Sequence, residues 1–211
     1  MVGVLGGTGD QGRGLAYRLA RAGQKVIIGS RAAERARAAA AELGDGLPVE
    51  GADNAECARQ SDIVIVAVPW DGHGATSRRC ARNWRASSSS TASTPRLRQE
   101  GRLRPHPDEG SAAQQAAALL PDSRVTAAFH HLSAVLLLDP AIERIDTDVM
   151  VLGEVRADVE QVQALAGRIP GMRGIFAGRL RNAHQVESLV ANLISVNRRY
   201  KAHAGLRLTD V

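Results

Sequence analysis

The feature that most constrains the fold is a glycine-rich turn between a short apolar run and a helical segment. Residues 2–5 are apolar, and residues 12–22 have the composition of a helix. Between them stands a match to the pattern G-x-G-x-x-G, formed by Gly7, Thr8, Gly9, Asp10, Gln11 and Gly12. A strand, a tight glycine turn and a helix in this order begin a βαβ unit, so the sequence predicts a parallel sheet with right-handed crossovers.

Apolar runs alternate with helical segments along most of the remaining chain. Further strands are expected at residues 25–29, 62–68, 124–129, 147–152 and 175–177, and helices at 32–43, 54–60, 111–120, 157–169 and 182–201. Asn54 is the expected N-cap of its helix, and residues 44–51 are interpreted as a loop. The fold class is α/β: a Rossmann-type parallel sheet with helices on both faces, followed by a small C-terminal α/β or helical domain. The two units are predicted to cover residues 1–140 and 141–211.

Composition excludes several classes of protein. The sequence has no run of about 18 apolar residues, so no membrane span is predicted. The first residues lack the features of a signal peptide. The two cysteines form no CxxC pair, so a cytoplasmic protein without disulfides is expected. The pI of about 10 does not indicate a nucleic-acid partner. Residues 77–107 alone carry a formal charge of +7, whereas the whole chain carries +5, so the other residues sum to −2.

The glycine motif predicts binding of a dinucleotide. Gly7 is expected to allow the tight turn, Gly9 to let the backbone approach a pyrophosphate, and Gly12 to permit close helix–strand packing. The first turn of the following helix then offers free N–H groups and a positive dipole end to the phosphates. The alternative is a turn that serves the fold alone.

The residues after the second strand indicate which dinucleotide is bound. NAD enzymes usually have a carboxylate at this point, which holds the ribose 2′-OH. Here the chain reads Ser30-Arg31 instead, and the planar guanidinium of Arg31 is suited to a 2′-phosphate. Arg35 and Thr8 are candidates to assist, so NADP(H) is predicted. The alternative is that Ser30 caps the next helix and Arg31 is a surface residue.

Two further groups follow strands, at the edge of the sheet where ligands bind. Pro69 and Trp70 end the strand at 62–68, and Trp70 is expected either to stack near a nicotinamide or to cover the sheet edge. His130, His131 and Ser133 follow the strand at 124–129, with either a ligand contact or a structural role. No acidic or cysteine partner stands at metal-ligand spacing, so no metal is expected. No catalytic acid, base or nucleophile is nominated.

Four stretches together resemble the NADPH-dependent reductases of the deazaflavin coenzyme F420. They read GGTGDQGRGLAYRLARAGQKVIIGSR, DIVIVAVPW, SRVTAAFHHLSAVLL and RLRNAHQVESLVANLISVNRRYKAHAG. The resemblance implies an N-terminal NADP-binding domain and a small C-terminal domain that closes the deazaflavin site. It implies NADP contacts at Thr8, Gly9, Asp10, Gln11, Ser30, Arg31, Arg35 and Trp70. His130, His131 and Ser133 fall near the nicotinamide and the deazaflavin.

The activity implied by this resemblance is hydride transfer between NADP(H) and coenzyme F420, with small-molecule partners only and a homo-oligomeric assembly. The long helix at 182–201 is the expected interface. Two other readings stay open: another NADP-dependent reductase on the same scaffold, such as an imine or metal-ion reductase, and a non-catalytic NADP(H)-sensing protein. Fold alone does not separate them.

Residues 77–107 depart from the family pattern, which has a helix and a strand there. The segment is rich in serine and arginine and has no period of 2 or 3.6. One choice of codons for residues 77–94, read one base earlier, yields LAALREELAGKLVVDCVN, and a further shift turns residues 95–107 into PLGFDKKGAYALTP. The hypothesis is that single-base losses changed the reading frame here. As written, the segment is expected to be irregular.

Overall fold

The parallel sheet expected from the βαβ pattern forms the centre of the molecule. The computed structural model describes residues 1–81, 88–91 and 110–211. The strands run in the order β3-β2-β1-β4-β5-β6-β7-β8 across the sheet, and their neighbours are parallel except for the antiparallel pair β6–β7. Their bounds are β1 (Val2–Leu5), β2 (Val26–Ser30), β3 (Val49–Asp53), β4 (Ile63–Val66), β5 (Ser88–Thr91), β6 (Arg124–Ala127), β7 (Thr147–Gly153) and β8 (Met172–Phe176).

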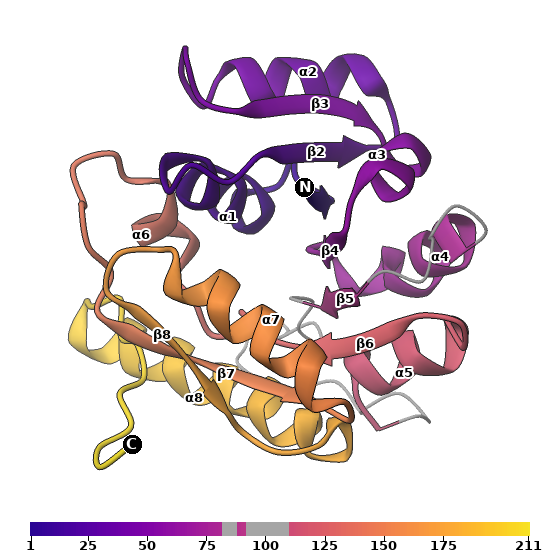
Figure 1. Ribbon diagram of the computed structural model, residues 1–211. Helices are drawn as coiled ribbons and strands as arrows, with labels where there is room; N and C mark the ends of the chain where they lie inside the picture. The colour runs from indigo at the N-terminus through magenta and orange to yellow at the C-terminus, as the bar shows by residue number, and fades with distance from the viewer. Residues whose placement is uncertain (82–87, 92–109) are drawn as a thin grey trace.

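Helices cover both faces of this sheet (Figure 1). Buried side chains of α1, α2 and α7 pack on one face and those of α3 on the other, while α5 and α8 share a third cluster with β6 and β7. The helices are α1 (Asp10–Arg21), α2 (Ala33–Ala41), α3 (Asn54–Gln60), α4 (Trp70–Ala81), α5 (Ala112–Leu119), α6 (Ala134–Leu138), α7 (Arg156–Gly167) and α8 (Ala183–Tyr200), with a 3-10 turn at Leu180–Asn182. Among the described residues, no helix combines the length and apolar character that crossing a membrane requires.

The central strands are apolar because both of their faces are buried. Val4 of β1 lies between Ile28 of β2 and Ile65 of β4 in the register. All three side chains are fully buried in the same cluster. The neighbouring Leu5 belongs to the cluster on the opposite face. The continuous apolar runs in the sequence therefore indicate strands that are covered by helices on both faces of the sheet.

A buried arginine joins α1 to the segment that follows β6. Arg18 is 3% exposed, and its guanidinium donates to the backbone carbonyls of Leu136, Leu137 and Asp139 at 2.6–2.8 Å. These carbonyls belong to the end of α6, where they lack helical partners. Charge-assisted bonds of this kind are stronger than neutral ones. Arg18 thus fixes α6, and with it the residues between β6 and α6, against the first helix.

The C-terminal elements extend the sheet beyond β6. Strand β7 pairs with β6 through Thr126 and Ala127, and β8 continues in parallel next to β7. The carboxylate of Glu187 on α8 accepts hydrogen bonds from the backbone N–H groups of Ala112 and Ala113, at 3.1 and 3.3 Å. Helix α8 is thereby attached to the first turn of α5. The boundary at residue 140 stays a prediction.

Three local expectations were wrong. Residues 44–51 contain the start of β3, which the sequence pattern did not indicate because an edge strand lacks a continuous apolar run. Asn54 is not the N-cap of α3; Asp53 is, with its carboxylate accepting from two backbone N–H groups. Residues 77–107 are not wholly irregular, because α4 continues to Ala81 and β5 occupies residues 88–91. Residues 82–87 and 92–109 lie outside the described residues.

Strand β5 takes the place in the sheet that the family pattern requires. It pairs with β4 on one side and β6 on the other, so it is a central strand. Its sequence is Ser-Ser-Ser-Thr, whereas a central parallel strand is normally apolar. In the shifted reading frame the same four positions read Leu-Val-Val-Asp. The strand therefore coincides with the apolar run of the shifted frame, and the frame hypothesis itself stays a prediction.

Replacing Ser88, Ser89 and Ser90 together by Leu, Val and Val is expected to raise the free energy of unfolding. Each apolar side chain buried in the sheet contributes about 1.5–3 kcal/mol. Urea unfolding followed by far-UV circular dichroism measures the change. Ser195→Ala, at an exposed position on α8, is the control and is expected to stay within about 0.5 kcal/mol of the parent. An unchanged or lower midpoint for the triple variant would contradict the expectation.

Candidate nucleotide-binding site

The turn between β1 and α1 is packed tightly against the ends of two neighbouring strands. Gly6 has φ +74°, and a Cβ on it would lie 2.6 Å from the carbonyl oxygen of Ala67, just after β4. A Cβ on Gly7 would lie 2.8 Å from Cγ2 of Ile28 on β2. The left-handed residue of the turn is therefore Gly6, and not Gly7 as the motif suggested. Gly7 is needed for close packing instead.

The turn ends at the first residues of α1. A Cβ on Gly12 would lie 2.7 Å from the carbonyl oxygen of Gly6, so Gly12 brings the helix onto the turn as expected. Gly9 is the N-cap, and no side chain caps the helix there. A Cβ on Gly9 would meet only the Gly6 oxygen, at 3.6 Å, so the space beyond Gly9 is open. The first N–H groups of α1 lack intrahelical partners and face a region suited to an anion.

A cleft of about 670 Å³ lies in front of this helix end. It follows the ends of β1, β2 and β4, where the strand order reverses from β3-β2-β1 to β4-β5-β6. Ligands of open α/β sheets bind at such a reversal. The predicted residues that line the cleft are Thr8, Gly9, Asp10, Gln11, Ser30, Arg31, Arg35, Pro69 and His130.

The end of the cleft next to β2 is suited to a phosphate. Ser30 is the last residue of β2 and is buried, while Arg31 and Arg35 are exposed. Neither arginine makes an ion pair within the described part of the chain. The N-cap of the next helix is Ala32, so Ser30 does not cap it. The residue pair Ser30-Arg31 thus keeps its polar groups available to a ligand.

A carboxylate stands beside this end without reaching into it. Asp53 lies opposite Ser30 in the register of β2 and β3. Its Oδ1 accepts from the backbone N–H groups of Ala55 and Glu56, both at 2.9 Å. Asp53 lines a separate, smaller pocket of about 240 Å³. Because this carboxylate is engaged in capping α3, the Arg31 end of the cleft remains basic.

The cleft also contains residues that sequence reasoning missed. Asn54 is 9% exposed and lines the cleft, and its Oδ1 has no hydrogen-bond partner among the described residues. Gly72 and Thr76 lie one turn apart on α4. Their spacing of four residues is the only signal that could have indicated a shared helix face. The remaining members are backbone neighbours of the motifs: Gly6, Ala67 and Val68.

Trp70 does not line the cleft. It is the first residue of α4 and stacks on His73, with ring centroids 5.7 Å apart and an angle of 15° between the planes. His73 is fully buried, and its Nδ1 lies 3.1 Å from Oε1 of Gln115 on α5. The indole therefore packs against α4, while the preceding Pro69 faces the cleft.

His130 lines the cleft from the segment that follows β6. It follows Phe129, which is fully buried and has φ 65°, a conformation rare for a residue with a bulky side chain. Nε2 of Gln11 donates to the Phe129 carbonyl oxygen at 3.4 Å. The His130 ring is 5% exposed, and neither of its nitrogens has a hydrogen-bond partner among the described residues. Burial, followed by the neighbouring His131, lowers the pKa of His130 to about 3.

His131 and Ser133 face a different cavity. They line a space of about 110 Å³ that is closed by residues of the C-terminal tail. Nε2 of His131 accepts from the backbone N–H of Met150 at 3.4 Å, and Ser133 Oγ lies 3.3 Å from Nδ1 of His203. Burial lowers the pKa of His131 to about 4. The structure therefore separates the two adjacent histidines.

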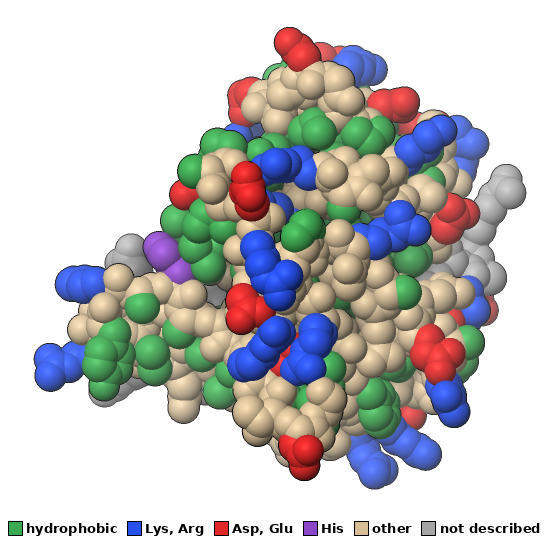
Figure 2. Space-filling model, turned by 60° about the vertical axis from the view of Figure 1, so that its left-hand side comes forward, with side chains coloured by type: hydrophobic (Ala, Val, Ile, Leu, Met, Phe, Trp, Pro, Cys, Tyr) green, Lys and Arg blue, Asp and Glu red, His purple; other side chains and the backbone are tan. Residues whose placement is uncertain are grey.

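Charged side chains of both signs are exposed on the surface of the molecule. On the face shown in Figure 2, Lys and Arg side chains alternate with Asp and Glu. That face does not present the uniform basic field with which proteins bind a phosphate backbone. Within the described ranges, no group of three His, Cys, Asp or Glu side chains is placed to hold a metal ion.

Comparison with known proteins identifies the family. The chain is 39% identical over 222 residues to an F420-dependent NADP reductase of Methanothermobacter marburgensis, covering 100% of this chain and 98% of that protein. A second F420-dependent NADP reductase, from Methanocaldococcus jannaschii, is 32% identical with the same coverage. The chain belongs to the F420-dependent NADP reductase family. The resemblance of the four sequence stretches is thereby confirmed.

Two further comparisons agree with this family. The family model described as NADP oxidoreductase, coenzyme F420-dependent, matches residues 1–88. A crystal structure from Arthrobacter sp. FB24, to which an F420-dependent NADP reductase function has been ascribed, superposes with a TM-score of 0.79. That chain is 24% identical, and the superposition covers 99% of this chain and 98% of that one. The structural match confirms the Rossmann-type fold over nearly the whole length.

The two buried histidines are expected to make stability depend on pH. Their pKa values in the folded protein, about 3 and about 4, lie below the usual value of about 6.5. As pH falls below about 6.5, the unfolded chain takes up protons that the folded chain does not, so stability decreases until the folded pKa values of about 4 and about 3 are passed. Urea unfolding between pH 7.5 and pH 5 should show a shallower decrease for His130→Asn and for His131→Asn than for the parent. Parallel curves would contradict the assignment.

Proposed function

We propose that this protein transfers a hydride between NADP(H) and the deazaflavin coenzyme F420. The observation that carries the proposal is the cleft at the start of α1, with Ser30, Arg31 and Arg35 at one end and His130 at the other. Its position at the reversal of strand order is that of a dinucleotide site. The identity with named F420-dependent NADP reductases extends over the whole chain and supports the second substrate.

The residues present fit a bound NADP(H). The backbone beyond Gly9 leaves a space that a side chain would fill. Asn54 and His130 line the cleft, and each has buried polar atoms without a hydrogen-bond partner among the described residues. Such atoms are rare in folded proteins unless a ligand or water satisfies them. A volume of about 670 Å³ is in the range of ligand-binding clefts.

Each part of the cleft has a distinct role in this proposal. The N–H groups at the start of α1 bind the pyrophosphate, with Thr8 and Gln11 at their sides. Ser30, Arg31 and Arg35 bind the 2′-phosphate. Pro69 and His130 border the nicotinamide, and the helix–strand packing at Gly7 and Gly12 holds the turn in place.

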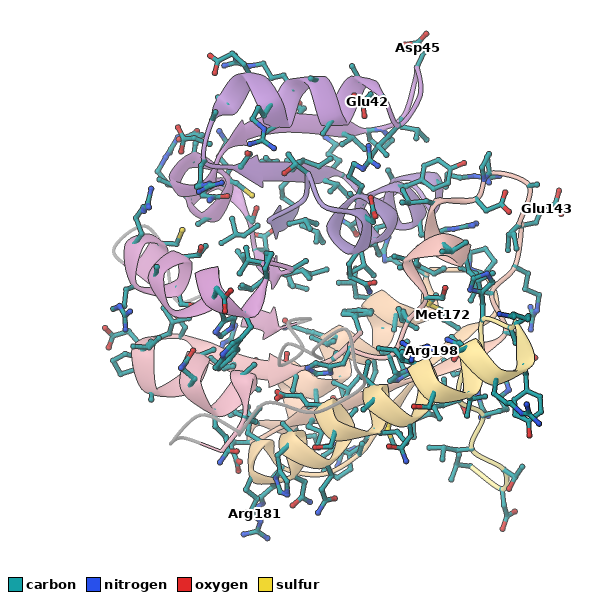
Figure 3. All side chains as sticks on the ribbon, turned by 180° about the vertical axis from the view of Figure 1, so that it is seen from behind. Glu42, Asp45, Glu143, Met172, Arg181 and Arg198 are labelled. Atoms are coloured by element: carbon teal, nitrogen blue, oxygen red, sulfur yellow. The ribbon has the colours of Figure 1, made fainter. Side chains whose placement is uncertain are left out.

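Asp10 places a negative charge close to the proposed phosphates. Its Oδ1 lies 3.3 Å from the Arg13 guanidinium, which also pairs with Glu42 at 2.8 Å. Figure 3 shows Glu42 at the end of α2. Because Asp10 is largely exposed and shares the Arg13 charge, its repulsion of a phosphate is weakened by the ion pair and by solvent.

The reaction requires little side-chain chemistry in this proposal. NADPH supplies the hydride from C4 of its nicotinamide. The protein holds the two rings against each other in a site from which water is excluded. His130 is neutral at physiological pH because its pKa is about 3, so it does not supply a proton. The C-terminal unit, residues 141–211, closes the deazaflavin site in this proposal, with His131 and Ser133 on that side of the β6–α6 segment.

The assembly is proposed to be a homo-oligomer that associates through α8. Apolar side chains of its second half, including Leu193, Ile194 and Val196, are half-buried or exposed. Figure 3 shows α8 along the outer side of the molecule, with Arg181 just before its start and Arg198 near its end. A second copy of the chain that paired through the same surface would cover this stripe. Sedimentation velocity of the parent and of Leu193→Asp decides between an oligomer and a monomer.

The activity itself is tested by a spectral experiment. When protein, NADPH and the oxidised deazaflavin are mixed, the visible band of the deazaflavin is expected to bleach as the hydride arrives at its C5. An NADP(H)-sensing protein would bind NADPH without bleaching. A reductase with another substrate would oxidise NADPH only when a cyclic imine or a metal ion replaced the deazaflavin.

Arg31→Ala is expected to weaken binding of NADP(H) by roughly 1.5–3 kcal/mol, the scale of a charge-assisted hydrogen bond. Affinity for NAD(H), which lacks the 2′-phosphate, should barely change. Calorimetric titration with both nucleotides measures the difference. Arg37→Ala removes an exposed arginine of α2 that lines the smaller pocket, and this control should leave both affinities unchanged. Equal losses for both nucleotides in Arg31→Ala would refute the role of Arg31.

A further inference from the structure

The α1 row, formed by Gln11, Gly14 and Arg18, holds the segment that joins β6 to α6. These residues stand at positions i, i+3 and i+7 of the helix, a spacing that places them on one face. Helix α6 lies next to α1 (Figure 1). At the start of the row, Nε2 of Gln11 donates to the carbonyl oxygen of Phe129 at 3.4 Å. At its end, Arg18 binds carbonyls of α6 and of the residues that follow, so the joining segment is fixed to α1 from both sides.

Arg18 brings a charge into a place where the packing does not need one. Its side chain is 3% exposed and makes no ion pair within the described part of the chain. Leu19 and Leu137 beside it belong to one apolar cluster, so an apolar side chain would fill the same space without the cost of burying a charge. The guanidinium supplies what an apolar side chain lacks, which is a set of four directed hydrogen bonds to one stretch of backbone. They go to the carbonyls of Leu136, Leu137, Asp139 and Ile142.

Gly14 determines how closely α1 and α6 approach each other. A Cβ on Gly14 would lie 2.6 Å from Cβ of Leu137, so a single methyl group would push the two helices apart. Glycine inside a helix is less favourable than alanine. Its presence here is explained by the close approach. The missing side chain of Gly14 and the four bonds of Arg18 together keep the spacing of the two helices within narrow limits.

The two elements joined by the α1 row carry different parts of the proposed site. The first turn of α1 faces the pyrophosphate in the proposed function. The joining segment lines the large cleft on one side and the cavity of His131 and Ser133 on the other. The alignment of the two reacting rings then depends on the spacing between α1 and this segment. A misplacement of about 1 Å at a reacting pair costs on the order of 100-fold in rate.

We propose, on the basis of the proposed function, that Arg18 and Gly14 are positioning residues for hydride transfer. Neither of them lines the large cleft. They act through the spacing between the nucleotide-binding turn of α1 and the joining segment. The rate of the transfer step therefore depends on them, whereas the affinity for the nucleotide does not.

Arg18→Met tests the hydrogen bonds, because methionine keeps an unbranched side chain and removes all four of them. Calorimetric titration should give a dissociation constant for NADP⁺ within about twofold of the parent value, since Arg18 lies outside the cleft. Single-turnover bleaching of the deazaflavin by saturating NADPH, followed by stopped flow, should be at least about tenfold slower. Deuterium at the transferred position of NADPH should slow it further, which places the defect in the transfer step.

Two more variants accompany Arg18→Met. Arg18→Lys, whose ammonium can donate to some of the same carbonyls, should recover part of the rate. Arg21→Met removes an exposed arginine from the same helix, with one long bond of 3.4 Å to the Pro140 carbonyl. This matched control should retain the parent rate.

Gly14→Ala tests the spacing without removing a hydrogen-bonding group. The added methyl group meets Leu137, while alanine favours the helix more than glycine does. Hydride transfer should again be slower at unchanged affinity for NADP⁺. Gly167→Ala is the matched control, because Gly167 ends α7 at an exposed position where a Cβ would meet no atom within 4 Å. It should react at the parent rate.

The outcomes separate positioning from a purely structural role and from the proposed function. If Arg18→Met or Gly14→Ala is folded by circular dichroism and transfers hydride at the parent rate, the inference is overturned, whatever its melting temperature. It is also overturned if the affinity for NADP⁺ falls by the same factor as the rate, because the defect then lies in the nucleotide site. If Arg18→Met does not fold, Gly14→Ala decides by the same criteria. A parent protein that binds NADP⁺ and does not bleach the deazaflavin refutes the proposed function, and this inference with it.

Discussion

The structure depends on the close approach of one turn of backbone to two strands. Gly6 and Gly7 lie so close to the end of β4 and to β2 that a single added methyl group would collide with backbone or side-chain atoms at 2.6–2.8 Å. This contact fixes the start of α1 above the point where the strand order reverses. The free N–H groups of the helix and the basic end of β2 consequently face one cleft. A larger residue in the turn would displace the helix and with it the cleft and the helix end that the proposed function assigns to the pyrophosphate.

A second constraint acts at the other end of the cleft. Gln11 on α1 donates to the Phe129 carbonyl, and Arg18, two turns further along the same helix, binds the carbonyls at the end of α6. The first turn of α1 thus forms part of the proposed phosphate site, and the same helix positions the segment that carries His130. In the proposed function, phosphate binding and the placement of the nicotinamide therefore both depend on α1, which suits transfer between two closely aligned rings.

Some of this could be predicted from the sequence because the signals are local. The glycine spacing, the apolar run before it and the Ser30-Arg31 pair indicated the dinucleotide site, and the structure places those residues around one cleft. Strand β3 was missed because an edge strand lacks a continuous apolar run. Strand β5 was missed because its residues, serine and threonine, carry no strand pattern. Its position is determined by its neighbours β4 and β6, whose carbonyls and N–H groups need a partner between them.

The sequence by itself determined the fold class, the glycine-rich turn and the family. Each depends on residues close together in the chain, whose spacing reflects the strand and helix periods. Only the tertiary structure decided which side chains share the site. It directed Trp70 onto His73, brought Asn54 into the cleft wall, and turned His130 and His131 toward different cavities. Adjacent residues after a strand can point to opposite sides, and which side faces a ligand depends on the left-handed Phe129 and its contact with a helix more than a hundred residues away in the chain.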